Sequence, residues 1–274
     1  MAIVVISRQV GSYGDKIAAL VAKTLNYELV DRSKVHQVAQ ECDPDFSGAC
    51  TLYEEERKPG FFESFFFQDP SYTSLFESLT YELASRGNVV ILGRGAQIVL
   101  RHFPEVFTAR IVAPTDVRVQ RIMLEKAVSV EEARHFIEKH DKQRSALIQS
   151  VFDRDLSDWT LYDVILNTAS YDADSGAKTI CEAIGAKLKP TNEAELTQKL
   201  KNMAFAKRVE SHIKKHIITS AYRNIFVSAT SDGVVTLSGF VSEQKEKTKV
   251  EKFAANVTGV KEVINDLRTT ELSF

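Results

Sequence analysis

The chain has 274 residues, roughly twice a typical domain, so its length favours two folded units and excludes a mini-protein that needs disulfides or a metal to fold. A hydrophobic fraction of 44%, a charged fraction of 26%, 12 glycines and 6 prolines exclude a fibrous or low-complexity chain. The net charge of -2 conceals a mildly acidic part up to residue 200 and a mildly basic part after it, and neither is extreme enough to require nucleic acid as a partner.

The cysteines and the apolar runs predict the compartment. Cys42, Cys50 and Cys181 are scattered without CxxC spacing, which fits neither a disulfide framework nor a zinc site and favours a reducing compartment. Beyond the helical pair His212 and His216, for which a solvated face is favoured, the histidines do not cluster as metal ligands, and the sequence assigns no metal-binding residue. Ser12, Asp31 and Asp141 stay open as contacts of a metal ion or of water. No apolar run approaches the roughly 18–20 residues of a membrane span, and the start MAIVVISRQVG lacks the basic segment of a signal peptide. We therefore expect a cytoplasmic protein.

The first part of the chain repeats a buried strand followed by a helix. Ala2–Ile6 is a short apolar run typical of a strand buried on both faces, and a glycine turn separates it from helical spacing between Ile17 and Leu25. Three further pairs follow: Asn88–Leu92 with Ala96–Arg101, Phe107–Val112 with Val117–Lys126, and Tyr162–Asn167 with Ser175–Lys187. This order predicts parallel strands joined by right-handed crossovers, and hence an α/β three-layer sandwich.

The composition changes after Lys187. Pro190 and polar residues predict a partly helical linker over residues 188–202. Beyond it, an amphipathic helix, two strands joined by the hairpin turn Ser231-Asp232-Gly233, a helix over Glu243–Asn256 and a last strand near Val260–Leu267 give the order αββαβ. The tail is therefore predicted to be a small α+β domain with its helices on one face of the sheet.

The turn after the first strand stands where a phosphate-binding loop would lie, because backbone N–H groups at a helix start can hold an anion. The segment Gln9–Lys16, QVGSYGDK, matches GxxxxGK[ST] poorly. Gln9 replaces the first glycine, Asp15 replaces the lysine, and Lys16 comes one place late. Two interpretations stay open on spacing alone: a phosphate site, or a turn that only packs the helix on the strand.

Three stretches resemble the cytidylate kinase-like family of P-loop nucleoside monophosphate kinases: ISRQVGSYG from Ile6, LNYELVDR from Leu25 and VILGRGA from Val90. The tail from about Phe205 is similar to the BON domain, with Gly233, Gly239 and Gly259 at its turns. The resemblance implies a P-loop kinase-type domain over residues 1–187, the linker over 188–202 and a BON-like domain over 203–274.

The resemblance also implies roles for residues. The phosphate-binding loop would comprise Arg8, Gly11, Ser12, Tyr13, Gly14, Asp15 and Lys16. Asp31, Arg32 and Arg94 would hold the acceptor, since an arginine fork meets a phosphate with paired charge-assisted hydrogen bonds.

The spacing of Asp141 and Arg144 resembles the DxxR of a kinase lid, whose arginines stabilise the transferring phosphoryl group and exclude water. The catalytic candidates are Arg144, Asp141, Arg134 and Lys16, and the candidates for nucleotide or lid contacts are Arg118 and Arg121. The alternative for each helical arginine is a solvated charged face.

The family implies ATP and Mg²⁺, and in-line transfer of the γ-phosphate to a nucleoside monophosphate such as CMP or to a related small acceptor. Asp15 opposes this, because a carboxylate near the phosphates costs about 2–4 kcal/mol at an effective dielectric constant near 20. We therefore expect a nucleotide kinase with a degenerate P-loop. The alternative is a nucleotide-binding regulatory protein with weak or no kinase activity that signals through its BON-like domain.

Two further features concern partners. The aromatic segment Gly60–Tyr72 either packs under the acceptor-binding lobe, covers the nucleotide site or forms a homodimer interface. In the BON-like tail, a solvated helix face is favoured over contact with an anionic membrane for the basic residues Lys207, Arg208, Lys214 and Lys215.

Overall fold

A computed structural model describes residues 1–31, 33–35, 37–38, 70–189, 191–217, 225–230 and 232–270 of the chain. The chain folds into two compact units. The first comprises Met1–Glu63 and Arg86–Glu193, and the second comprises Ser64–Ser85 and Ala194–Phe274. Each unit has its own sheet and its own hydrophobic core.

The first unit is built on a parallel sheet of five strands in the order β2-β3-β1-β4-β5. The strands are β1 (Ile3–Arg8), β2 (Glu28–Val30), β3 (Val89–Leu92), β4 (Val106–Val112) and β5 (Val164–Asn167). The opening strand lies at the centre, with Ile6 in register with Leu92 of β3 and with Ala109 of β4. Its continuous apolar sequence fits this place, because a central parallel strand is covered on both faces. The predicted parallel α/β sheet is confirmed.

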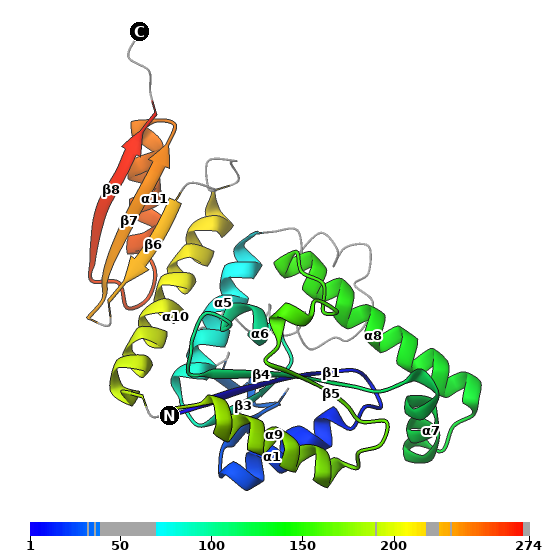
Figure 1. Cartoon of the computed structure of the whole chain (residues 1–274). Coiled ribbons are helices and arrows are strands. Elements are labelled where there is room, and N and C mark those ends of the chain that lie inside the picture. Colours follow the sequence, from blue (N-terminus) through cyan, green and yellow to red (C-terminus); the bar gives the residue numbers. More distant parts are fainter. Residues whose placement is uncertain are drawn as a thin grey trace. The chain divides into compact units, whose positions relative to one another are not determined.

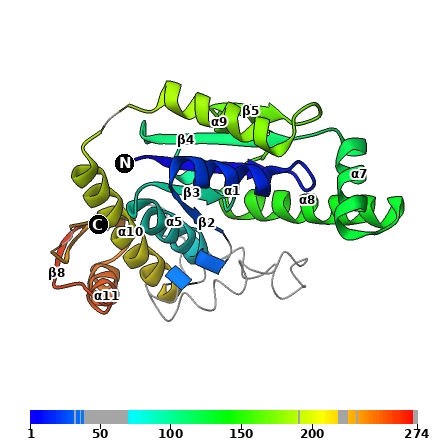
Figure 2. The same ribbon diagram turned by 90° about the horizontal axis from the view of Figure 1, so that it is seen from below.

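Helices cover both faces of this sheet. Figure 1 shows α1 (Gly14–Leu25) and α9 (Ala173–Lys187) on one side, and α6 (Ala96–Val99) and α8 (Val130–Phe152) on the other. Figure 2 shows α1 and α9 from below, lying along the strands. Helix α7 (Thr115–Lys126) packs on α8, and a short 3-10 helix, η1 (Trp159–Leu161), precedes β5. The three-layer architecture that the alternating pattern predicts is thus present.

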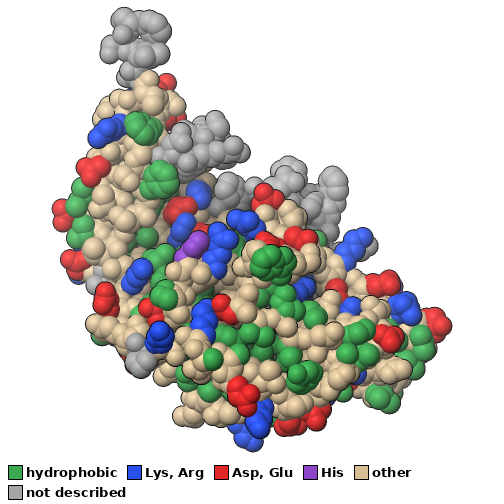
Figure 3. Space-filling model, viewed as in Figure 1, with side chains coloured by type: hydrophobic (Ala, Val, Ile, Leu, Met, Phe, Trp, Pro, Cys, Tyr) green, Lys and Arg blue, Asp and Glu red, His purple; other side chains and the backbone are tan. Residues whose placement is uncertain are grey.

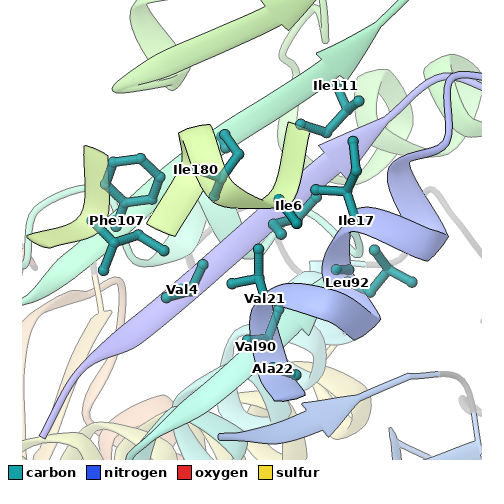
Figure 4. Close-up of a cluster of buried hydrophobic side chains, with 14 of the residues drawn as sticks. Val4, Ile6, Ile17, Val21, Ala22, Val90, Leu92, Phe107, Ile111 and Ile180 are labelled. Atoms are coloured by element: carbon teal, nitrogen blue, oxygen red, sulfur yellow. The ribbon is translucent and has the colours of Figure 1, made fainter. Parts of the chain in front are cut away.

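The core between the sheet and α1 and α9 fixes the start of α1. Val4 and Ile6 of β1 point into it and meet Ile17 and Val21 of α1 and Ile180 of α9 (Figure 4). Each of these side chains is fully buried, which stabilises the fold by about 1.5–3 kcal/mol per residue. Because side chains alternate along a strand, the neighbouring Val5 and Ser7 point to the opposite face.

The C-terminal part of the second unit has the predicted order of elements. They are α10 (Glu193–His216), β6 (Ile225–Ala229), β7 (Val234–Val241), α11 (Gln244–Ala255) and β8 (Glu262–Thr269). Strands β6 and β7 are antiparallel, whereas β7 and β8 are parallel. Val209 and Ile213 of α10 pack with Val235, Leu237 and Val250 over one face of this sheet. The αββαβ domain is confirmed.

Helix α5 (Pro70–Ser85) belongs to this second unit, although it precedes β3 in the chain. Its small hydroxyl side chains bond directly to α10. Ser78 Oγ donates to the carbonyl of Ala204 at 2.7 Å, and Ser211 Oγ of α10 donates to the carbonyl of Ser71 at 2.8 Å. Helix α10 runs without a break from Glu193, so it also occupies most of the expected linker. The aromatic segment from Gly60 lies outside the described residues up to position 69.

Glutamates and lysines reinforce the pairing of α5 and α10. Lys207 Nζ lies 2.8 Å from Glu77 Oε2 and 2.9 Å from Glu210 Oε2, and Lys214 also pairs with Glu210. Burial alone would raise the pKa of the Glu210 carboxyl, but Lys207 and Lys214 outweigh it and hold this pKa below its ordinary value. These two lysines are therefore engaged in ion pairs within the unit, which differs from the solvated helix face that the sequence favoured for them and from the alternative of a membrane surface.

The surface carries mixed charges. On the face seen in Figure 3, basic and acidic side chains are interspersed over the described residues. None of the described helices combines the length and the apolar character of a membrane-crossing segment.

The Glu210→Gln variant tests the link between α5 and α10. Two lysine ammonium groups would lose their shared carboxylate, so we expect the free energy of unfolding to fall by about 2 kcal/mol near neutral pH. Because the pKa of Glu210 is lowered, its stabilisation is full above the ordinary value of 4.5 and is lost as the pH falls through the folded-state pKa. Urea unfolding followed by far-UV circular dichroism measures both effects.

The matched control is Glu262→Gln, because Glu262 is an exposed glutamate of the same unit. Equal stabilities of the Glu210 and Glu262 variants at neutral pH would contradict a stabilising role for the charge network.

Candidate functional site

The turn between β1 and α1 is held in a defined conformation. Gly11 and Tyr13 are both left-handed, with φ of 73° and 66°. A side chain on Gly11 would also approach the Arg118 carbonyl oxygen to 2.9 Å, so the turn packs closely on α7. Gln9 has a structural reason to replace glycine, because its Oε1 accepts a hydrogen bond from the Ala113 N–H at 3.1 Å. This bond fastens the turn to the end of β4.

The turn leaves a group of backbone donors unpaired. Ile17 N–H donates to the Tyr13 carbonyl at 2.8 Å, which is the first hydrogen bond of α1. Ahead of it, five N–H groups have no acceptor within the described residues, and they belong to Gly11, Tyr13, Gly14, Asp15 and Lys16. Unpaired N–H groups at a helix start carry partial positive charge and can receive an anion.

Arg8 brings a full positive charge to this turn. A Cβ atom on Gly14 would lie 2.3 Å from the Cβ of Arg8, so the Arg8 side chain passes directly over the backbone of Gly14. A Cβ atom on Gly93 would lie 2.7 Å from Arg8 Nη1, which places the guanidinium between the turn and the residue that follows β3. Arg8 thus places a cation from the strand beside the turn, whereas in a P-loop the cation is a lysine of the following helix.

Asp15 is the counter-ion of Arg8. Its Oδ1 accepts from Arg8 Nη2 at 2.8 Å, while the Arg8 side chain is 15% exposed and the Asp15 side chain is 64% exposed. The carboxylate that the sequence places beside the phosphate site is therefore compensated by the adjacent guanidinium. An anion entering the turn would compete with Asp15 for Arg8.

Asp141 and Arg118 direct their polar atoms to the backbone of the turn. Asp141 Oδ1 accepts from the Val10 N–H at 3.0 Å, and its Oδ2 accepts from Arg118 Nη1 at 2.5 Å. Arg118 is buried and also donates to the Val10 carbonyl at 3.3 Å. These two residues therefore join the turn to α7 and α8, and both carboxylate oxygens of Asp141 are engaged.

The other predicted arginines divide into two groups. Arg144 Nη1 donates to the Arg8 carbonyl at 3.1 Å, and Arg121 donates to the Thr168 carbonyl at 2.6 Å. The Arg121 guanidinium stacks 3.7 Å from the centre of the Tyr13 ring. Arg134 differs, because it is exposed near the start of α8, about 10 Å along the helix axis from Asp141.

Lys16 is exposed, with its Nζ 5.3 Å from the centre of the Tyr13 ring. Ser12 is fully buried, and its Oγ donates to the Gln9 carbonyl at 2.8 Å. Its own carbonyl accepts from Thr168 Oγ1 at 2.9 Å. Ser12 and Thr168 therefore stabilise the turn from below, whereas Lys16 faces solvent.

The predicted acceptor residues follow β2 and β3. Gly93, Arg94 and Gly95 are consecutive left-handed residues, with φ of 76°, 68° and 73°. Asp31 Oδ1 accepts from Ser33 Oγ at 2.8 Å. Burial raises the pKa of Asp31, but hydrogen bonds from Ser33 and Lys34 and the charge of Arg94 outweigh burial and leave this pKa below its ordinary value. Asp31 and Arg94 thus act on one another electrostatically, whereas Arg32 lies outside the described residues.

Sequence reasoning missed two polar residues at the same edge of the sheet. Thr168 is fully buried beneath the turn, and the one feature of the sequence that could have predicted its role is its place directly after β5. Arg110 lies within β4, and its signal is a charged residue inside the otherwise apolar run FTARIV. Neither residue belongs to a recognisable motif, so only the fold brings them to the site.

The described residues contain no group of three or more His, Cys, Asp or Glu side chains that could hold a metal ion. The Ser12 hydroxyl and the Asp141 carboxylate already bond to protein groups. The residues around the turn are thus suited to an anion rather than to a bare cation.

Comparisons with known proteins give matches for both parts of the chain. Residues 3–170 match the model of the cytidylate kinase-like family, and residues 205–271 match the BON domain. A cytidylate kinase of Pyrobaculum islandicum is 23% identical over 192 residues, which cover 68% of this chain and 97% of that protein. One from Methanopyrus kandleri is 32% identical over 111 residues, covering 38% and 58% of the two chains. The crystal structure of an uncharacterized protein from Eubacterium ventriosum superposes with a TM-score of 0.51 at 21% identity, covering 68% of this chain and 99% of that one.

The Gly14→Ala variant tests whether Arg8 and the turn form an anion site. The new methyl group would occupy the space of the Arg8 side chain and displace the guanidinium. We expect the affinity for inorganic tripolyphosphate, measured by calorimetry, to fall roughly tenfold or more, as for the loss of one charge-assisted contact.

Gly185→Ala is the matched control, because a Cβ atom there meets nothing within 4 Å and the residue lies inside α9. We expect this variant to keep its tripolyphosphate affinity and to gain up to about 1 kcal/mol of stability. Unchanged tripolyphosphate binding in a folded Gly14→Ala variant would contradict the assignment.

Proposed function

The chain belongs to the cytidylate kinase-like family, and from this premise we propose that it transfers the γ-phosphoryl group of ATP to a nucleoside monophosphate such as CMP, or to a related small acceptor. Kinase activity on a nucleotide or a small molecule is the general class that the family supports. The monophosphate acceptor is the finer part of the proposal.

The placement of Arg8 carries this proposal. Phosphoryl transfer depends on positioning and on neutralising the charge of the β- and γ-phosphates, and the protein needs little covalent chemistry of its own. The five N–H groups of the turn that find no acceptor in the described part of the chain, together with the Arg8 guanidinium, supply donors and charge at one place. A guanidinium is always charged and can contact two phosphate oxygens at once, so it can replace the loop lysine.

The remaining candidates surround this centre. We assign Arg144 to the transferring phosphoryl group, because it already lies against the carbonyl of Arg8. Arg121 and Tyr13 form a flat stacked pair beside the turn, where the donor nucleotide would extend. Arg94 and Asp31 would meet the acceptor at the ends of β3 and β2.

ATP would bring Mg²⁺, whose chemical contribution is to neutralise charge on the β- and γ-oxygens. The Ser12 hydroxyl and the Asp141 carboxylate are engaged within the protein, so neither is free to be a ligand of this ion. Phosphate oxygens and water would hold it.

A second candidate function is a nucleotide-binding regulator with little or no turnover. The ion pair between Arg8 and Asp15 favours this regulatory function, because the Asp15 carboxylate already pairs with the guanidinium that a phosphate would have to bind. Nucleotide binding seen by calorimetry in a protein that consumes no ATP with any monophosphate acceptor would establish this second function in place of the first.

The Arg8→Ala variant tests the proposed catalytic charge. In an assay coupled to ATP consumption, we expect kcat/KM to fall about 10²–10³-fold, the range for removal of one transition-state donor. Arg101→Ala is the control, because Arg101 is exposed and precedes β4, at the opposite edge of the sheet from the turn. Equal losses in both variants would speak against a specific role of Arg8.

The Asp15→Asn variant tests the opposing charge. Removing the carboxylate frees Arg8 and ends the repulsion of ATP, so we expect the KM for ATP to fall about 5- to 30-fold, equivalent to about 1–2 kcal/mol. Asp174→Asn, in the first turn of α9, is the control and should leave this KM unchanged. A KM for ATP that rises in the Asp15 variant would mean that Asp15 helps to hold Arg8 for the substrate.

A further inference from the structure

Arg110 occupies an unusual place for an arginine. Phe107 and Ile111 of β4 point into the core below α1 and α9, so Arg110 points to the opposite face of the sheet (Figure 4). It is in register with Ser7, the last residue but one of β1. Arg110 therefore stands at the carboxyl edge of the parallel sheet, where ligands of open α/β folds bind.

Neutral groups hold the guanidinium in position. Arg110 Nη1 lies 3.1 Å from Ser7 Oγ and 3.1 Å from the hydroxyl of Tyr162, and the guanidinium lies 5.5 Å from the centre of the Tyr162 ring. The Tyr162 hydroxyl in turn donates to the Leu156 carbonyl at 3.0 Å. Ser7 is itself only 4% exposed. The side chain is therefore oriented before any ligand arrives.

No carboxylate of the described residues pairs with the charge of Arg110. Within the described residues, Arg110 forms no ion pair, and its Nε and Nη2 have no acceptor. The pKa of Asp155 is lowered mainly by hydrogen bonds from Ser157, and the charge of Arg110 makes a smaller contribution. Ser157 donates to both carboxylate oxygens of Asp155, so this carboxylate is not a counter-ion of Arg110. A half-buried cation without a counter-ion is costly in a folded protein unless an anionic ligand completes it.

We propose that Arg110, oriented by Ser7 and Tyr162, binds the phosphate group of the acceptor. This inference rests on the proposed kinase function and assigns to Arg110 the recognition of the negative charge of the acceptor. Arg8 and Arg110 lie on the neighbouring strands β1 and β4, and the alternation of side chains directs them to opposite faces of the sheet. In-line transfer requires the donor and the acceptor to approach the transferring group from opposite sides, which suits two cations placed in this way.

The transfer balances without a proton donor or a redox partner. An oxygen of the acceptor phosphate forms a bond to the γ-phosphorus of ATP, while the bond from that phosphorus to the β–γ bridging oxygen breaks. ADP leaves with the electron pair of the broken bond. Arg110 would hold two of the other acceptor oxygens through Nε and Nη2, which leaves one oxygen to attack.

The experiment compares the Arg110→Met, Arg110→Lys and Tyr162→Phe variants of the full chain. In the coupled assay with CMP, we expect Arg110→Met to raise the KM for the acceptor roughly 10- to 100-fold while the KM for ATP stays within about twofold. Arg110→Lys should recover part of the loss, and Tyr162→Phe, which keeps the ring, should show a smaller effect. A merely structural role would instead shift both KM values together or neither, and either result would overturn the proposal.

Calorimetry keeps the inference separate from the proposed function. If the wild type turns over no acceptor, titration with CMP and with inorganic phosphate still tests the Arg110 site. The site is supported if the wild type binds these ligands and the Arg110→Met variant does not. A wild type that binds ATP but neither CMP nor inorganic phosphate overturns the Arg110 proposal, while the nucleotide site at the turn stands.

Discussion

The close approach of the Arg8 side chain to the backbone of Gly14 is the contact on which the candidate site depends. Only a residue without Cβ can stand at position 14, because Arg8 already fills that volume. The cation thus comes from the rigid end of the central strand rather than from the first turn of the helix. A charged side chain that a strand holds in place loses less conformational freedom when an anion binds. Under the proposed function, Arg8 can therefore take the part of the loop lysine without weakening the binding of phosphate.

The turn is held by arginines whose first task is structural. Arg118 and Asp141 bind the Val10 backbone, and Arg121 binds Thr168, which itself bonds to Ser12. These contacts come from α7, α8 and the end of β5, so three separate elements determine where the five N–H groups lie that have no acceptor among the described residues. Donors held in this way need no reorganisation when charge develops, which is what the proposed kinase function requires of the turn.

The sequence predicts the architecture well and the site only in part. Apolar strands such as Ile3–Arg8, followed by a helix with apolar residues at helical spacing, form a local pattern that the tertiary structure keeps. The partners of Arg8, Asp141 and Arg110 lie 7, 131 and 103 positions away in the chain, and no local pattern encodes them. The sequence alone does not predict that Asp15 is compensated, because its counter-ion, Arg8, lies on the other side of the turn. It does not predict the pairing of α5 with α10 either, because the two helices lie far apart in the chain.

That pairing decides how the chain is divided between the two units. Helix α5 lies within the segment that matches the kinase family, yet it forms a compact unit with α10 and the BON domain. The chain passes from α5 to β3 through only three residues, 86–88, and β3 leads directly to Gly93, Arg94 and Gly95. Buried hydrogen bonds and shared glutamates fix α5 to α10, so the division between the two compact units does not follow the order of the chain.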